Sequence, residues 1–365
     1  MTQTEAFPHK RLVSLDAFRG ATIALMVLVN TPGKGSASYA PLKHSAWNGW
    51  TITDVVFPSF LWIVGVAITL SLGSRLAAGV PKATLLLQAA RRALILYILG
   101  LIVYAWPLDL GTQRLLGVLQ RIAICYLIAA AIYLCGSLRT QLIWLIGLLT
   151  AYWLLMTLVP VPGFGPGRLD VEGNLAHYID RIVLGAHNYH STKTWDPEGL
   201  MSTLPAIATA LLGVMAGHLI RAQRQLTERV TWMFFTGNAL IALGMICNMW
   251  LPINKKLWTS SFSLFMGGLD FVILAMFIWL VDHLGYQRYV RPAVIMGMNS
   301  IAVYMASELF DEVLDETGAH KAIYNSLLAP NFSPANASLA YAVAYVLLMY
   351  AIAYFLYRRK WFWRV

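Results

Sequence analysis

Long apolar runs, each long enough to cross a lipid bilayer, dominate this chain and restrict how it can fold. About 20 helical residues span the roughly 30 Å hydrocarbon core of a bilayer. Ten runs fit that length, near residues 15–31, 52–74, 93–106, 116–135, 141–159, 200–220, 230–251, 258–281, 292–309 and 338–357. With 58% hydrophobic and 12% charged residues, the chain has too little polar material to cover a soluble globule. We therefore expect an all-α, polytopic membrane bundle of about ten transmembrane helices, forming a single domain over residues 1–365 in a lipid bilayer.

The distribution of Lys and Arg predicts which side of the membrane each loop occupies. An even number of spans places both termini on one side. The segments on that side carry 16 Lys and Arg residues, and the opposite loops carry nine. Cytoplasmic loops are enriched in these residues, so we expect both termini in the cytoplasm. The formal net charge of +10 is spread in short clusters between spans, which argues against a nucleic-acid-binding face.

Three of the predicted outer loops are long, near 32–51, 160–199 and 310–337. They are rich in Gly, Pro, Asn, His and aromatic residues. Loops of that length in compact proteins are usually functional or disordered, and the aromatic content favours packed structure. The three cysteines lie inside apolar runs without the spacing of a zinc site, so no metal is expected.

Polar residues from distant parts of the chain fall at a similar depth, near the outer ends of the predicted spans. Side chains of this kind are costly in a membrane and therefore mark functional sites. The set comprises Asn30, His44, Trp47, Asn48, Asp54, Gln120, Arg121, Asp196, Glu198, Asn254, Lys255, Trp258 and Glu308, with Asn299 and Ser300 nearer mid-membrane. Such convergence is typical of a site inside a helical bundle.

Several of these residues also have a purely structural interpretation. His44 fits an ordinary loop histidine, and Asp54 fits a cap at the start of its helix, where the helix dipole favours a carboxylate. Arg121 lies about a turn inside the membrane, where a guanidinium needs a partner. Its expected structural partner is Glu308 or Asp54, and its functional partner would be a phosphate.

Eight short strings, in order along nearly the whole chain, resemble the heparan-α-glucosaminide N-acetyltransferase family, including its bacterial NagX-like members. The strings are RLVSLDAFRG (11–20), HSAWNGWT (44–51), DVVFP (54–58), GVLQR (117–121), DPEGL (196–200), LWTSS (257–261), GMNSI (297–301) and YRRK (357–360). The resemblance implies an acetyl-CoA-dependent N-acyltransferase in the bacterial inner membrane. It would move an acetyl group from cytosolic acetyl-CoA to the amine of a glucosamine-type sugar on the outer side.

The resemblance also implies roles for individual residues. His44 matches the family's active histidine and Asn30 its active-site asparagine. His44 would act as general base or as a transient acyl acceptor, and Asn30 would donate to the thioester oxygen. Apart from the resemblance, the closeness of Asp54 to His44 in the sequence predicts that Asp54 orients His44. For the donor we expect contacts from Arg121, Gln120, Asn299, Ser300 and Trp258, with cytoplasmic Arg75, Arg91, Arg92 and Arg288 near its nucleotide end. For the amino sugar we expect contacts from Trp47, Asn48, Glu198 and Glu308.

Two other functions remain open at this level. An amino-sugar permease would also have ten helices and a polar site within the bundle. Visible sequence halves or inverted repeats would favour that alternative, and none is apparent. A non-catalytic scaffold would leave the polar set unexplained. A homodimer is a further expected partner arrangement, which the residues neither require nor oppose.

Overall fold

The computed structural model describes residues 12–105 and 109–363, and over these residues the protein is helical with no β-strand. Nine described helices are long and apolar enough to cross a membrane, and one bent pair of helices passes the same test when the two are taken as one span. The nine begin with α1 (Val13–Asn30), α2 (Ile52–Ala77), α3 (Lys82–Val103), α4 (Val118–Cys135) and α5 (Leu138–Leu158). They continue with α7 (Thr203–Arg221), α8 (Leu226–Cys247), α9 (Ser260–Phe277, extended by a π-helical turn to His283) and α13 (Pro334–Arg358). The bent pair is α10 (Arg291–Met298) and α11 (Ser300–Glu316).

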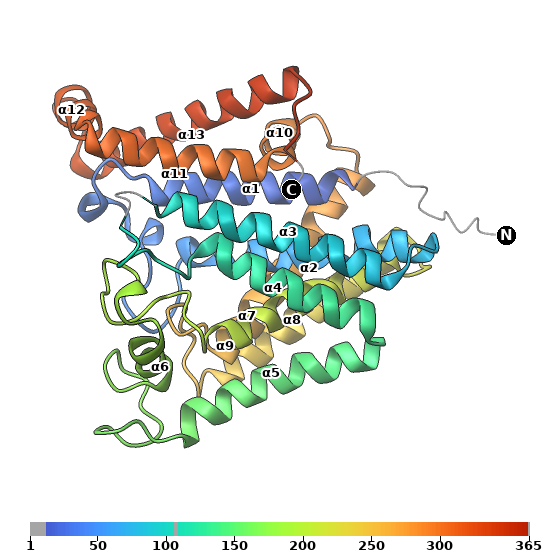
Figure 1. The fold of residues 1–365 in the computed structure, drawn as a ribbon. Helices are drawn as coiled ribbons and strands as arrows, with labels where there is room; N and C mark the ends of the chain where they lie inside the picture. The colour runs from blue at the N-terminus through green and yellow to red at the C-terminus, as the bar shows by residue number, and fades with distance from the viewer. Residues whose placement is uncertain (1–11, 106–108, 364–365) are drawn as a thin grey trace.

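The long helices lie side by side, and the short helices α6 (Leu175–Val183) and α12 (Ala319–Ile323) lie at the same end of the bundle, on opposite edges of it (Figure 1). We call that end the site end. Helix α1 begins and α13 ends at the opposite end, as ten crossings require (Figure 1). The all-α bundle of about ten spans is therefore confirmed, while the cytoplasmic placement of the termini stays a prediction. Lys10, Arg11 and Arg364, which entered the charge count, lie outside the described residues.

Three sequence-based boundaries were wrong. The run predicted at 93–106 belongs to a helix that begins at Lys82, because the charges near its start do not interrupt the helix: the Arg92 guanidinium lies 5.1 Å from the centroid of the Tyr126 ring. The run at 292–309 is two helices bent by 79°. The loop predicted at 310–337 is largely helical, because α11 continues to Glu316 and α12 follows it.

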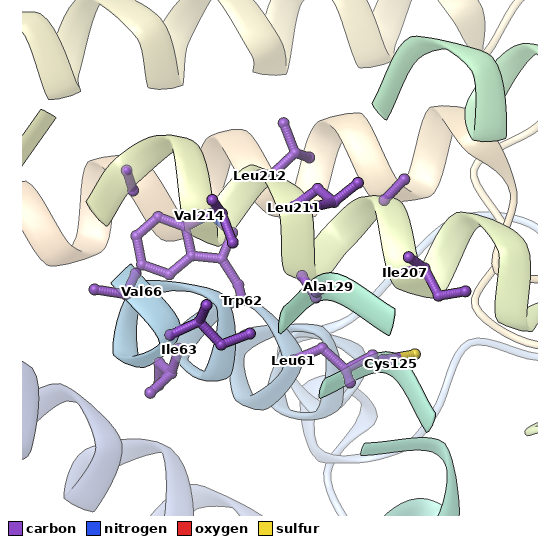
Figure 2. Close-up of a cluster of buried hydrophobic side chains, with 14 of the residues drawn as sticks. Leu61, Trp62, Ile63, Val66, Cys125, Ala129, Ile207, Leu211, Leu212 and Val214 are labelled. Atoms are coloured by element: carbon purple, nitrogen blue, oxygen red, sulfur yellow. The ribbon is translucent and has the colours of Figure 1, made fainter. Parts of the chain in front are cut away.

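Helices α2 and α7 form the tightly packed centre of the bundle. A Cβ atom at Gly65 would overlap the Ala210 carbonyl oxygen, and one at Gly213 would overlap the Trp62 carbonyl oxygen. Small residues at such crossings let helix backbones approach closely in a membrane, where packing drives association. Figure 2 shows the side chains around this crossing, from α2 (Leu61, Trp62, Ile63, Val66), α4 (Cys125, Ala129) and α7 (Ile207, Leu211, Leu212, Val214).

The segment between α5 and α7 packs against the site end of the bundle. A buried apolar cluster joins it to α5 and to the loop before α9, through Tyr152, Met156, Val161, Leu175, Ala176 and Leu257. The Tyr152 hydroxyl donates to the Leu257 carbonyl oxygen over 2.5 Å. The packed loop thereby holds polar residues of the segment over the ends of the spans.

Candidate active site

His44 and Asp54 form a hydrogen-bonded pair at the start of α2. The distance from His44 Nδ1 to Asp54 Oδ1 is 2.7 Å. Asp54 Oδ2 accepts from the backbone N–H groups of Ser45 and Thr51, each at 3.0 Å. A carboxylate that only accepts requires the hydrogen on Nδ1, which leaves the lone pair of the imidazole on Nε2. The His44 side chain is 49% exposed and Asp54 is 1% exposed, so the base atom faces an accessible region and its orienting partner does not.

Asp54 performs both of the roles that its sequence position suggested. It is the third residue of α2 and completes a capping box with Thr51, in which each side chain accepts a hydrogen bond from the other residue's backbone. The same carboxylate holds the ring of His44. The Asp54 side chain therefore fixes both the start of α2 and the orientation of His44. Such a pair is the base–orienter arrangement of acyl-transfer enzymes.

A loop between α8 and α9, missed as part of the catalytic set, meets His44 from the other side. Lys255 Nζ lies 3.2 Å from His44 Nδ1, 3.5 Å from its Nε2 and 3.8 Å from Asp54 Oδ1. The loops are joined by a hydrogen bond from the Gly49 N–H to the Ile253 carbonyl oxygen over 2.7 Å. The signal was present in the sequence, because Lys255 stands three residues before the Trp258 that carries part of the family resemblance.

Asn30, the last residue of α1, has an exposed side chain at the site end. Its carboxamide lies beside the Glu308 carboxyl on α11. An amide group offers two N–H donors to acceptors within reach. The structure thus joins two of the predicted site residues, Asn30 and Glu308, and places no hydrogen bond between Asn30 and His44 in the described part of the chain.

Arg114 is the centre of a buried charge network that sequence reasoning missed. Its guanidinium donates to both carboxylate oxygens of Asp196, at 2.8 and 2.6 Å, and to Glu198 at 2.5 Å. It also lies 4.7 Å from the Tyr104 ring centroid and 4.4 Å from that of Tyr189. Planar guanidinium groups suit such bidentate and stacked contacts. The sequence had marked Arg114 only as an outer-loop charge.

The electrostatics of this network link it to the rest of the site. Burial raises the pKa of the Glu198 carboxyl, but the positive charges of Arg114, Arg121 and Lys255 together lower it by more. The pKa therefore lies below its ordinary value. Burial raises the pKa of the Tyr104 phenol, and the carboxylates of Glu308 and Glu198 add to that effect. The charges around Lys255, Arg114, Glu198 and Glu308 therefore act on one another at the site end.

The expected ion pair of Arg121 with Glu308 or Asp54 was wrong. Its guanidinium is fully buried and donates to the Gly199 carbonyl oxygen, at 2.8 Å, and to the Ser202 hydroxyl. It also lies 5.2 Å from the Trp258 ring centroid. Any residue can supply a backbone carbonyl, so the sequence could not reveal this partner. Within residues 12–105 and 109–363, Nε and Nη1 of Arg121 have no hydrogen-bond partner.

Gln120 and Trp258, predicted with Arg121 as donor contacts, are both fully buried. Gln120 faces α3, where its side chain fills the space beside Gly100, while Arg121 faces α7. Trp258 donates from its indole N–H to the Thr209 hydroxyl over 3.2 Å and packs edge-on against Phe57. These side chains occupy the interior of the bundle, and their contact with a donor stays a prediction.

Asn299 and Ser300 do not join the site end. They stand at the break between α10 and α11, away from α6 and α12 (Figure 1). Asn299 donates to the Trp361 carbonyl oxygen over 3.1 Å and accepts from the Trp363 N–H over 3.0 Å. The sequence did not reveal this break, and the mid-membrane position of the two residues stays a prediction.

Trp47 and Asn48 connect the loops of the site end. The Trp47 indole N–H donates to the Leu169 carbonyl oxygen over 3.0 Å, and its ring lies edge-on to His177 and Trp195. The Asn48 side-chain oxygen accepts from Asn254 over 3.2 Å. Asn48 keeps an exposed side chain, and Trp47 is half-buried. Among the described residues, no three His, Cys, Asp or Glu side chains are grouped to hold a metal ion.

The fold and the paired residues define a polytopic membrane protein with a histidine–carboxylate pair at one end of its helix bundle. The profile of the family "Heparan-alpha-glucosaminide N-acetyltransferase, catalytic" matches residues 11–253. The heparan-alpha-glucosaminide N-acetyltransferases of Homo sapiens and Mus musculus are each 32% identical to this chain. Their alignments cover 97% and 100% of this chain, and 60% and 62% of those proteins.

The chain therefore belongs to the heparan-α-glucosaminide N-acetyltransferase catalytic family, and the resemblance in its short motifs is confirmed. It spans about three fifths of the length of the two curated relatives. The matched range contains Asn30, His44, Asp54 and the Arg114 network, whereas Lys255 and Glu308 lie beyond it.

Proposed function

We propose that this protein is a membrane-embedded acetyltransferase that moves an acetyl group from acetyl-CoA to the amine of a glucosamine-type sugar. The observation that carries the proposal is the His44–Asp54 pair, held within a chain of this family with the Nε2 side of the ring accessible. Following the charge count, the site end faces away from the cytoplasm, and the location is a bacterial inner membrane.

The chemistry needs a base and a way to stabilise negative charge, both of which the site offers. The amine nitrogen bonds to the thioester carbonyl carbon while the carbonyl π pair moves to oxygen, and His44 Nε2 takes the proton that the nitrogen loses. The carbonyl then re-forms, the carbon–sulfur bond breaks, and the departing sulfur takes the proton from His44. The products are an amide and a free thiol. If His44 instead carries the acetyl group between two half-reactions, Nε2 is the atom that bonds it.

Other residues take supporting roles in this proposal. Asn30, beside Glu308, donates from its carboxamide to the thioester oxygen. Glu308 and Glu198 supply carboxylates near the acceptor amine, and the exposed Asn48 and the half-buried Trp47 border the sugar. Asp54 orients His44 without touching the reactants.

The donor must reach the site end from the opposite side. A small pocket between α2, α3 and α4, lined by Ile68, Ser71, Arg92 and Tyr126 among others, offers it one cation. Within the described residues, the buried Arg92 Nε has no hydrogen-bond partner. A guanidinium with a free donor suits a phosphate or amide oxygen of the donor. Arg121 retains two unpartnered nitrogens for the same purpose.

The test is acetyl transfer by purified protein supplied with labelled acetyl-CoA and glucosamine. We expect N-acetylglucosamine from the wild type and a roughly 10²–10⁴-fold lower rate from His44→Ala, the usual loss for a general base. His190→Ala is the matched control, because His190 is an exposed loop histidine at the same end. Acetyl-CoA binding should survive in His44→Ala.

The alternative function, an amino-sugar permease, predicts a different result for the same purified protein. Vesicles containing the protein would accumulate unmodified amino sugar without consuming thioester, and His44→Ala would alter that flux. Either sugar flux without thioester consumption, or near-normal acetyl transfer by His44→Ala, would contradict the acetyltransferase proposal.

A further inference from the structure

Lys255 is a cation placed beside the two ring nitrogens of His44, with more N–H donors than these contacts can use. An ammonium group has three donors. The only carboxylate oxygen within ion-pair distance, in the part of the chain that the structure describes, is Asp54 Oδ1 at 3.8 Å. His44 Nδ1 lies closer, at 3.2 Å, but its hydrogen points to Asp54 and it has no lone pair to offer. Nε2 carries the lone pair of the ring, lies 3.5 Å away and can accept one N–H, so the ammonium keeps other donors free beside it.

The backbone around Lys255 is built to hold it there. Asn254 is fully buried, accepts the Leu257 N–H on its side-chain oxygen over 3.0 Å, and donates to Asn48. Trp258 adopts a left-handed conformation with φ of 50°, which is strained for a bulky residue. Lys256, the next residue, donates to the Ala46 carbonyl oxygen over 2.7 Å and joins the two loops. Strain of this kind persists only where surrounding contacts over-determine the conformation.

We propose that Lys255 is a catalytic residue whose ammonium group stabilises the oxyanion that forms when a carbonyl carbon is attacked beside His44 Nε2. The inference rests on the proposed acetyl transfer. In that step the carbonyl π pair moves onto oxygen within reach of Nε2, where Lys255 already holds a positive charge with free donors. Fixed charges of this kind need no reorganisation during reaction. Burial lowers the pKa of Lys255 and the carboxylates of Asp54 and Glu198 raise it, so the surroundings partly restore the charged form.

Lys255→Met and Lys321→Met form a matched pair for the test, because Lys321 is an exposed lysine on α12 at the same end of the bundle. We expect Lys255→Met to lower kcat for acetyl transfer by about 10²–10³-fold, as loss of an oxyanion donor does, with acetyl-CoA affinity unchanged within a few-fold. Lys255→Arg should recover part of the rate. Lys321→Met should stay within a few-fold of wild type. If Lys255→Met does not fold, Lys255→Gln retains most of the side-chain length and replaces it.

A second measurement is independent of acetyl-CoA and of the sugar. Diethyl pyrocarbonate acylates histidine through a tetrahedral oxyanion, and peptide mass spectrometry follows its addition to His44 alone. We expect this addition to be several-fold slower in Lys255→Met than in Lys321→Met.

The outcomes separate the two proposals. Equal His44 acylation in the two variants, or equal kcat, overturns the role of Lys255 even when the wild type transfers acetyl groups. A loss confined to acetyl-CoA affinity also overturns it. If the wild-type protein transfers no acetyl group but its His44 acylation still depends on Lys255, the proposed function is overturned. That result supports charge stabilisation at His44.

Discussion

Replacing Arg114 with Met should destabilise the protein severely, because it leaves two buried carboxylates without their cation. The side chain of Asp196 is 0% exposed and that of Glu198 is 10% exposed. Removing one partner from a buried ion pair costs about 3–5 kcal/mol, and the lost contacts with the Tyr104 and Tyr189 rings add roughly 1 kcal/mol. Met keeps much of the apolar volume, so the loss is electrostatic rather than a cavity.

Thermal unfolding of detergent-solubilised protein, followed by tryptophan emission, measures this effect. A loss of this size should lower the apparent Tm by about 5–15 °C. Arg168→Met is the matched control, because Arg168 makes an exposed ion pair with Asp170 at 2.7 Å. Exposed pairs contribute about 0–1 kcal/mol, so the control should unfold within about 2 °C of wild type.

Neutralising Asp196 and Glu198, the carboxylates that lose their cation in Arg114→Met, should restore stability. The triple variant Arg114→Met, Asp196→Asn, Glu198→Gln removes both buried charges and should unfold well above Arg114→Met alone. The single variant should also gain stability on acidification, because protonation removes the same charges. An Arg114→Met protein as stable as Arg168→Met, or a triple variant less stable than the single one, would refute this account of the network.

Three further outcomes are expected from the structure. Burial raises the pKa of Asp180 to about 6, so the folded protein binds this proton more tightly than the unfolded chain does. The free energy of unfolding should therefore fall by on the order of 3 kcal/mol, relative to Asp180→Asn, as the pH rises from about 4 to about 6. Melting curves of both proteins across that range check the sign. Gly213→Leu should prevent α2 and α7 from packing and abolish folded protein on size-exclusion chromatography, whereas Gly147→Leu, with open space around it, should not. Cysteine labelling in intact cells should find position 82 cytoplasmic and position 325 outside, as the charge distribution predicts.

The parts of the fold that sequence predicts well are those that lipid dictates. A bilayer requires long apolar helices, and the ten runs in the sequence correspond to nine helices and one bent pair in the described residues. The pairing of His44 and Asp54 was also predictable, because only ten residues separate them and the capping pattern of Thr51 and Asp54 fixes the start of α2. Local sequence carries enough information for both features.

The features that sequence missed depend on contacts between distant segments. Arg114 lies in a loop, and its burial requires residues 196 and 198 to fold over it from more than 80 positions away. Arg121 is satisfied by a backbone carbonyl, which any residue can supply. The break at Asn299 depends on backbone contacts with the segment after α13. Hydrophobic periodicity contains none of this information.

The site is held rigid by the same elements that build the fold, which explains how loop residues can act with catalytic geometry. Asp54 caps α2 and orients His44, so moving the histidine requires disturbing the start of a helix whose interior packs against α7. Lys255 reaches the ring from a turn that is fixed by buried Asn254 and leads directly into α9. Catalytic groups need positions held within about 0.5 Å, and attachment to packed helices supplies that precision better than mobile loops do. The strained backbone at Trp258 therefore belongs to the frame of the site, because its indole anchors that turn to Thr209 on α7.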